Sequence, residues 1–74
     1  SMLAQVGFDS YEIKGILKGL SDNTTVFLTN GVTGQTIATA TAKEGQFTLK
    51  GKLTQPELVQ IGFNGKNEKL DMFI

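Results

Sequence analysis

The side chains of this 74-residue sequence that could take part in chemistry are carboxylates, lysine amines and hydroxyls, because His, Cys, Arg and Trp are absent. Without His or Cys there is no imidazole base, no thiol nucleophile and no nitrogen or sulfur ligand for a metal. Without Arg there is no bidentate clamp for phosphate. This composition predicts no catalytic residue, no cofactor and no metal site.

The carboxylates remain as candidates for acid–base or calcium chemistry. A calcium loop needs oxygen ligands at regular short intervals, and a glycosidase needs two carboxyl groups about 5–9.5 Å apart across a sugar site. The sequence has no such loop spacing, and nothing in it indicates a close pair. A small hydrolase is therefore the least favoured function. The carboxylates are Asp9, Glu12, Asp22, Glu44, Glu57, Glu68 and Asp71.

Two other patterns could serve in binding. Residues 62–66 resemble a phosphate loop, but the glycine spacing is wrong and no Ser or Thr follows Lys66, so we interpret them as a hairpin turn. Thr39 and Thr41 share one face of an expected strand, where their hydroxyls could hold water or a sugar. Such a row is more often the solvated face of a strand, because Thr is both polar and β-favouring.

Phe27 and Phe73 are the aromatic residues that strand alternation directs away from the core. Successive side chains of a strand point to opposite faces, so Phe27 lies opposite Val26 and Leu28, and Phe73 lies opposite Met72. Outward Phe side chains in a two-layer fold indicate a second packed face or an interface. We therefore predict that Phe27 and Phe73 contribute to a contact with another chain or domain.

The elements that carry these residues are short strands, because apolar and polar residues alternate with a period of two and no long window has helical spacing. Nine Gly and a single Pro fit tight turns between them. The pattern predicts an all-β fold, a small antiparallel β-sandwich or open barrel of about six short strands. The strands are expected at residues 11–17, 25–29, 36–42, 47–53, 59–63 and 70–74.

Glycines mark special points in this pattern. Gly15, Gly51 and Gly62 fall inside expected strands, where each indicates a bulge, a bend or a close approach of the backbone. Gly45 suits the left-handed position of a bulged hairpin turn.

Length and charge limit the domain count and the partners. We expect one domain over residues 11–74, preceded by residues 1–10 as a cloning scar (Ser1 and Met2) and a flexible N-terminal segment. Seven Lys and seven Asp or Glu give a net charge of zero, so we expect no nucleic-acid partner. No apolar run approaches the roughly 20 residues of a transmembrane segment. The thin core of a chain with 39% apolar residues favours a homodimer or contact with a neighbouring domain.

Several short motifs in order resemble a known family over about residues 11 to 74. A strand ends in Gly-x-hydrophobic-x-Gly-Leu, a second ends in Leu, and a Gly-x-Phe-x-hydrophobic-x-Gly strand precedes a Pro. The sequence is similar to the N-terminal domain of unknown function that precedes the thioredoxin domain in Bacteroidetes envelope thiol:disulfide interchange proteins. The matching segments are 11–20 (YEIKGILKGL), 25–28 (TVFL), 40–51 (ATAKEGQFTLKG) and 55–59 (QPELV).

The resemblance implies an all-β module in the periplasm or cell envelope, on a secreted or lipid-anchored parent protein. It implies no catalytic residue in this segment, since the redox Cys pair of such proteins lies in the thioredoxin domain. The first functional hypothesis is therefore a non-catalytic structural or protein-interaction module of an envelope protein. The alternative is a glycan- or small-ligand-binding β module that uses outward Phe and Thr side chains.

Overall fold

Seven β-strands and the turns between them make up the structure, a computed structural model that describes residues 2–6, 10–52, 55–65 and 69–74. Every strand pairing is antiparallel, and no helix occurs among the described residues. The strands are β1 (Met2–Val6), β2 (Ser10–Ile16), β3 (Thr25–Asn30), β4 (Thr36–Thr41), β5 (Gln46–Lys52), β6 (Leu58–Phe63) and β7 (Lys69–Phe73).

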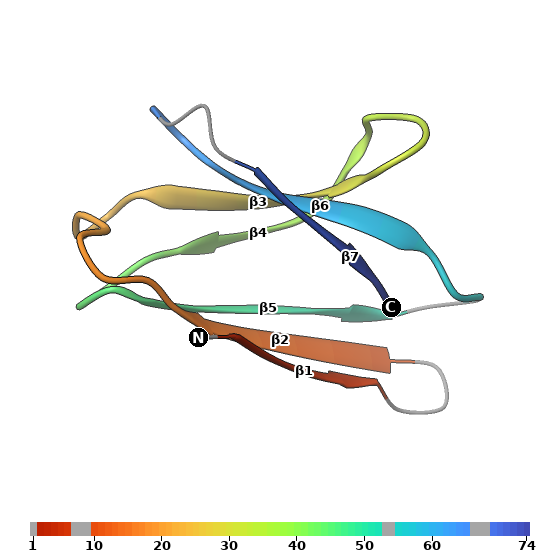
Figure 1. Cartoon of the computed structure of the whole chain (residues 1–74), viewed down its shortest axis with the longest axis horizontal. Helices are drawn as coiled ribbons and strands as arrows, with labels where there is room; N and C mark the ends of the chain where they lie inside the picture. Colours follow the sequence, from red (N-terminus) through yellow and green to blue (C-terminus); the bar gives the residue numbers. More distant parts are fainter. Residues whose placement is uncertain (1, 7–9, 53–54, 66–68) are drawn as a thin grey trace.

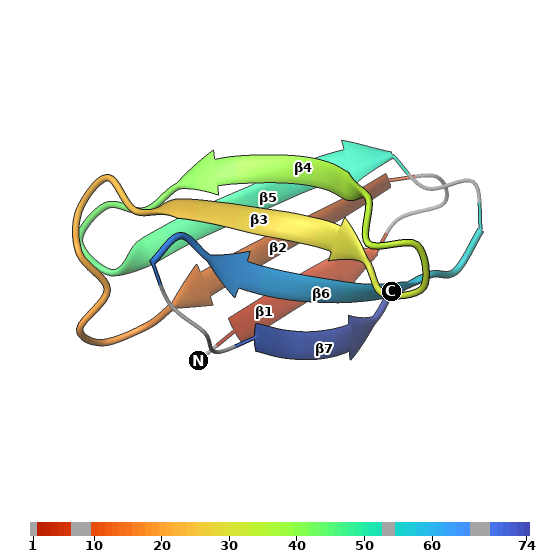
Figure 2. The same ribbon diagram turned by 90° about the horizontal axis from the view of Figure 1, so that it is seen from above.

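The strands form two sheets that stack as layers (Figure 1). Sheet A has the order β1-β2-β5, and sheet B has the order β4-β3-β6-β7. Seen from above, the strands of sheet B lie inclined across those of sheet A (Figure 2), as in a two-layer β-sandwich. Since β4 and β5 are consecutive but belong to different sheets, the turn between them joins the layers at one side. The prediction of a small antiparallel all-β domain is confirmed, in its sandwich form.

The N-terminal strand β1 differs from the sequence prediction. Residues 1–10 were expected to be a scar and a flexible segment, but residues 2–6 pair with β2 from Met2 opposite Gly15 to Val6 opposite Tyr11. The expected count of six strands was therefore one short. Five residues carry too short an alternation to identify a strand. Residues 2–6 form a strand because they pair with the edge of β2 that β5 leaves free, and the local sequence does not indicate this pairing.

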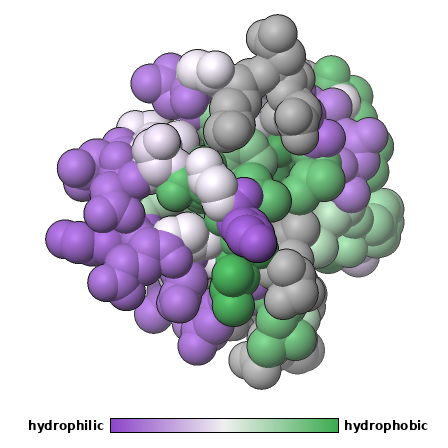
Figure 3. Space-filling model, turned by 60° about the vertical axis from the view of Figure 1, so that its left-hand side comes forward, coloured by the Kyte–Doolittle hydropathy of each residue, from purple (hydrophilic) through white to green (hydrophobic). Residues whose placement is uncertain are grey.

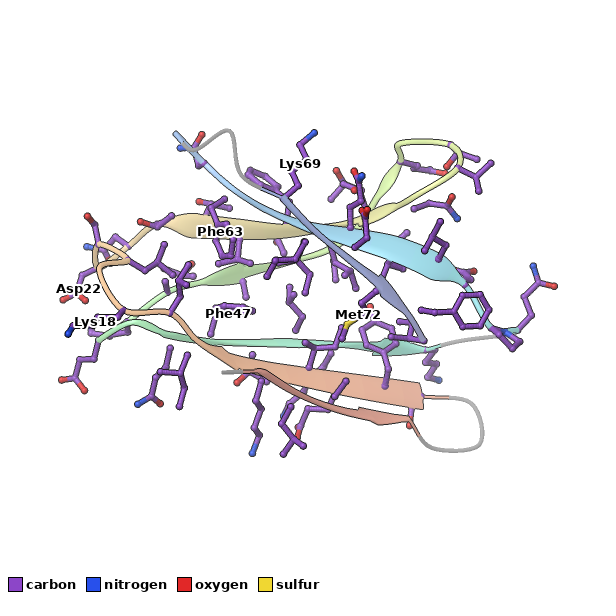
Figure 4. All side chains as sticks on the ribbon, in the orientation of Figure 1. Lys18, Asp22, Phe47, Phe63, Lys69 and Met72 are labelled. Atoms are coloured by element: carbon purple, nitrogen blue, oxygen red, sulfur yellow. The ribbon has the colours of Figure 1, made fainter. Side chains whose placement is uncertain are left out.

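The core lies between the sheets and comes mainly from alternate residues of β2, β3, β5 and β6. Across the layers, Phe47 of sheet A and Phe63 of sheet B form an edge-to-face pair with ring centroids 5.8 Å apart and ring planes at 72° (Figure 4). Two apolar residues, Phe8 and Leu53, fall outside the described residues. The buried core residues are Tyr11, Ile13, Leu20, Val26, Leu28, Ala42, Phe47, Leu49, Val59, Ile61, Phe63 and Ile74.

Two strand glycines give room to aromatic rings in sheet A. Gly15 faces Phe47 across β2 and β5, and Gly51 faces Tyr11 across the same pair of strands. A Cβ atom at either glycine would overlap the ring of its cross-strand partner. The predicted close approach is thus confirmed for Gly15 and Gly51. At Gly62, the one atom of the described residues that a Cβ would meet within 4 Å is the Lys69 Cγ, at 3.9 Å, so no close approach occurs there among these residues.

The turn between β4 and β5 is tighter than the bulged turn that the sequence predicts. Lys43 and Gln46 form an isolated bridge with two backbone hydrogen bonds of 2.9 Å. The two residues between them, Glu44 and Gly45, have φ of 53° and 76°, which is the pattern of a type I′ turn. Gly45 is left-handed as predicted. The Asp22 Oδ1 accepts a 2.8 Å hydrogen bond from the Glu44 N–H and so holds the non-glycine residue in this conformation.

Candidate interaction surface

An exposed apolar cluster lies at one end of the outer face of sheet B. Phe73 of β7 is 72% exposed, and its cross-strand neighbour on β6, Leu58, is 43% exposed. Val32, in the loop between β3 and β4, is 84% exposed and borders a shallow hollow that Leu58 also lines. We name Val32, Leu58 and Phe73 the loop-end patch.

The loop between β3 and β4 is held in place beside β6. The Gly31 N–H donates a 2.8 Å hydrogen bond to the Leu58 carbonyl. The Asn30 Oδ1 accepts hydrogen bonds from the backbone N–H groups of Val32, at 2.8 Å, and Thr33, at 3.0 Å. Such a side-chain-to-backbone turn is typical of Asn. Because both contacts fix backbone atoms, Val32 is presented next to Leu58 by a defined loop conformation.

The orientation predicted for Phe73 agrees with the structure. Met72 points between the layers (Figure 4), and Ile74 is buried, so Phe73 between them faces outward. Cross-strand pairing with Leu58 rather than with a polar residue makes an apolar pair on the solvent side. An exposed aromatic–aliphatic pair of this kind is a frequent component of interaction surfaces.

Phe27 also points outward, but it is half-buried and lies apart from the loop-end patch. Its neighbours are Val26 and Leu28, which are fully buried. On the outer face its ring borders a small hollow lined also by Gly62 and Lys69. Because Phe27 pairs with Gly62, and Gly62 lies four residues from Leu58 on β6, the two Phe positions are separated by about 13 Å along the strands. The structure therefore does not bring Phe27 and Phe73 into one site.

The sequence prediction missed two members of the patch. Leu58 could have been recognised, since alternation through Val59 and Ile61 directs it outward like Phe73. Val32 carries no such signal, because loop residues have no periodicity that defines a buried and an exposed side. Its position next to Leu58 depends on β3 pairing with β6, which are separated by two other strands in the sequence.

A second, polar groove runs between β4 and β5, where the two sheets diverge from their connecting turn. Thr39 and Thr41 lie on its β4 side, and Gln46 and Thr48 lie on its β5 side. Phe47 also borders it but is only 5% exposed. The two threonines thus share a face as predicted, and they adjoin other groups that can hydrogen bond to a hydroxylated ligand.

The described carboxylates are dispersed over the surface. Glu12 lies on the outer face of sheet A, with its oxygens 3.6 Å from the Lys14 Nζ and 3.4 Å from the Lys50 Nζ. In the described part of the chain, no group of three carboxylates could hold a metal ion. Two further carboxylates, Asp9 and Glu68, fall outside the described residues.

Tyr11 belongs to the core rather than to a ligand pocket. It is the single tyrosine of the chain, 4% exposed, and its ring covers Gly51. Burial raises the pKa of the Tyr11 hydroxyl above its usual value of 10.0, and the negative charge of Glu57 raises it further. Burial has this effect because the phenolate is poorly solvated there.

We expect the tyrosinate absorbance of the chain to titrate above pH 10, and to report Tyr11 alone. The folded chain keeps the hydroxyl proton at a pH at which the unfolded chain releases it. The free energy of unfolding should therefore fall as pH rises beyond about 10, towards the folded pKa. Tyr11→Phe is the matched control, because it retains the ring and all the lysines and should lose this part of the slope. A titration midpoint at or below 10 in the folded chain would contradict the expectation.

Comparison with known proteins identifies one family. Residues 11–74 match the model of a family described as Domain of unknown function (DUF4369). Neither the curated proteins nor the solved structures include a significant match to the chain. A search for membrane-spanning helices found none of sufficient length and hydrophobicity among the described residues.

Proposed function

We propose, from the premise that the chain belongs to the DUF4369 family, that it is a non-catalytic interaction module of a bacterial envelope protein. Its loop-end patch docks against a neighbouring domain of the same protein. The observation that carries this proposal is the exposure of Phe73, at 72%, beside its cross-strand neighbour Leu58, which shares a hollow with Val32. Aromatic residues, Phe among them, are enriched at protein–protein interfaces relative to the rest of the surface.

The order of motifs in residues 11–74 supports the envelope context, because it resembles the domain that precedes thioredoxin domains in Bacteroidetes thiol:disulfide interchange proteins. In that context the parent is a periplasmic or lipid-anchored protein, and the redox cysteines lie outside this chain. The neighbouring domain is then a thioredoxin domain. The module contributes binding surface and spacing, and the chemistry belongs to its neighbour.

We expect the labelled chain to bind the separately produced thioredoxin domain of a Bacteroidetes envelope thiol:disulfide interchange protein. In an NMR titration, the amide shifts should cluster at residues 31–33, 57–58 and 71–73. Phe73→Ser should weaken the binding about tenfold or more, because aromatic anchors carry much of the energy of such contacts.

The matched control is Leu3→Ser, which removes a side chain of similar exposure, 57%, from the outer face of sheet A. This variant should bind as the unchanged chain does. Absence of amide shifts at millimolar concentration, or equal weakening by the Phe73 and Leu3 variants, would contradict the proposal.

A second candidate function, glycan binding, is favoured by the polar groove between β4 and β5. Its Thr, Gln and Lys side chains can donate hydrogen bonds to sugar hydroxyls. It ranks second because Phe47, the one aromatic residue among the described residues that line it, is buried and offers no stacking platform. Oligosaccharides that shift the amides of Thr39, Thr41 and Thr48 in the same NMR experiment would favour it over docking at the loop-end patch.

A further inference from the structure

Strand β7 ends sheet B and pairs on one side only. It bonds to β6, with Leu70 opposite Ile61 and Asp71 opposite Gln60, and no described strand lies on its other side. Its backbone therefore offers a row of free N–H and C=O groups, which can pair with another extended segment.

The side chains of β7 make this edge both charged and apolar. Lys69 and Asp71 lie on the outer face, and Lys69 points away from the core (Figure 4). Leu70 and Met72 lie on the inner face, yet Leu70 is 44% exposed because the sandwich is open beside it. Figure 3 shows hydrophobic residues gathered towards this side and polar residues over the end formed by the β2–β3 and β4–β5 connections. An inner-face leucine left half-exposed indicates that the sheet has room for a further strand.

We propose that β7 pairs antiparallel with β7 of a second copy of this chain, about a two-fold axis at Leu70. In an antiparallel pair, residues directly opposite each other lie on the same face. This register places Lys69 opposite Asp71 of the partner subunit, and Asp71 opposite Lys69 of the partner subunit. It also places the two Leu70 side chains together on the inner face, so that sheet B continues across the axis and its core side is extended.

Charge selects this register over its neighbours. A shift of the axis to Asp71 keeps the inner face continuous but brings two aspartates together, which is unfavourable. A shift of the axis to Met72 puts Asp71 opposite Phe73 of the partner subunit. In that register neither Asp71 nor Lys69 lies opposite a residue of opposite charge. The register at Leu70 is the one in which both charges of the strand find an opposite charge.

The other edges lack this self-complementarity. β4 and β1 contain no charged residue, and β5 carries Lys50 and Lys52 without a carboxylate. Charge pairing therefore distinguishes β7 among the edge strands. The inference goes beyond the proposed function and does not rest on it.

Charge reversal tests the pairing. The unchanged chain should sediment as a dimer at high micromolar concentration. Lys69→Asp places two pairs of aspartates across the axis, and Asp71→Lys places two pairs of lysines there, so each variant alone should dissociate about tenfold more readily or worse. An equimolar mixture of the two variants should recover the dimer, because every pair is again of opposite charge. Lys52→Asp on β5 is the matched control and should leave the dimer unchanged.

A single cysteine tests the register directly, since the chain has no other. Opposite residues of an antiparallel pair have Cα atoms about 4.5–5.5 Å apart, within the range that a disulfide spans. Leu70→Cys should therefore form a covalent dimer under mild oxidation. Ile37→Cys, on the β4 edge with a similar exposure of 39%, should form much less.

Circular dichroism of each variant keeps the tests independent of folding. A monomeric mass for the folded, unchanged chain up to millimolar concentration would overturn the proposal. So would a mixture of folded charge variants that stays monomeric, or cross-linking that is equal at Leu70→Cys and Ile37→Cys.

Discussion

Phe47→Ala is expected to lower the free energy of unfolding by about 3–5 kcal/mol, the usual loss for truncating a buried Phe. The ring is 5% exposed, meets the ring of Phe63 across the two sheets, and covers Gly15 on its own sheet. Because Gly15 has no side chain, the residue opposite Phe47 on β2 cannot fill the space that the ring leaves. A 74-residue domain has a stability of about 4–11 kcal/mol, so the loss should remove at least about a quarter of this stability and, at the low end of the range, all of it.

Urea unfolding followed by circular dichroism measures this loss. Thr48→Ala is the matched control, since Thr48 is the exposed neighbour of Phe47 on β5 and should change stability by less than about 0.5 kcal/mol. A loss below about 1.5 kcal/mol for Phe47→Ala would contradict the expectation that this ring stabilises the packing of the two sheets. A double-mutant cycle that combines Phe47→Ala with Phe63→Leu measures the edge-to-face contact separately. If that contact contributes to stability, the coupling free energy should be about 0.5–1.5 kcal/mol.

Gly15→Ala is expected to destabilise the domain by about 1–3 kcal/mol, the cost of overpacking a close-packed core. Replacing a glycine by alanine inside a strand normally stabilises the protein, because alanine lowers the conformational entropy of the unfolded chain. Gly15 is not among the residues with positive φ, so the backbone itself accepts a side chain. The loss comes from the Phe47 ring, which occupies the position of the new Cβ atom.

Gly62→Ala is the matched control for this substitution. It also lies inside a strand without positive φ, but the one atom in the described part of the chain that its Cβ would contact is the Lys69 Cγ, at 3.9 Å. Its stability should stay the same or rise by up to about 1 kcal/mol. The double variant Gly15→Ala with Phe47→Leu should lose less than the sum of the single losses, because the smaller side chain vacates the contested space. Equal changes in stability for Gly15→Ala and Gly62→Ala would refute the explanation that the Phe47 ring occupies the Cβ position of Gly15.

The candidate surface was predictable in part. Alternation alone directs Phe27 and Phe73 outward, and both do point outward. It could not tell that Phe27 would be half-buried beside Gly62, or that Phe73 would find Leu58 as its neighbour. These outcomes depend on which strands pair and in which register, and strand pairing joins residues far apart in the chain. Whether Phe73 serves as an interface remains a prediction.

The sequence by itself determined the all-β class, six of the seven strands and the inward or outward direction of their side chains, because a period of two is a local property of the backbone. The strand glycines were also visible as special points, and two of them, Gly15 and Gly51, are points of close approach. Only the tertiary structure decided the order of strands in the two sheets, the addition of β1, the rings over Gly15 and Gly51, and the free edge at β7. Each of these is a pairing between distant segments, set by the packing of the whole core and not by any one stretch of sequence.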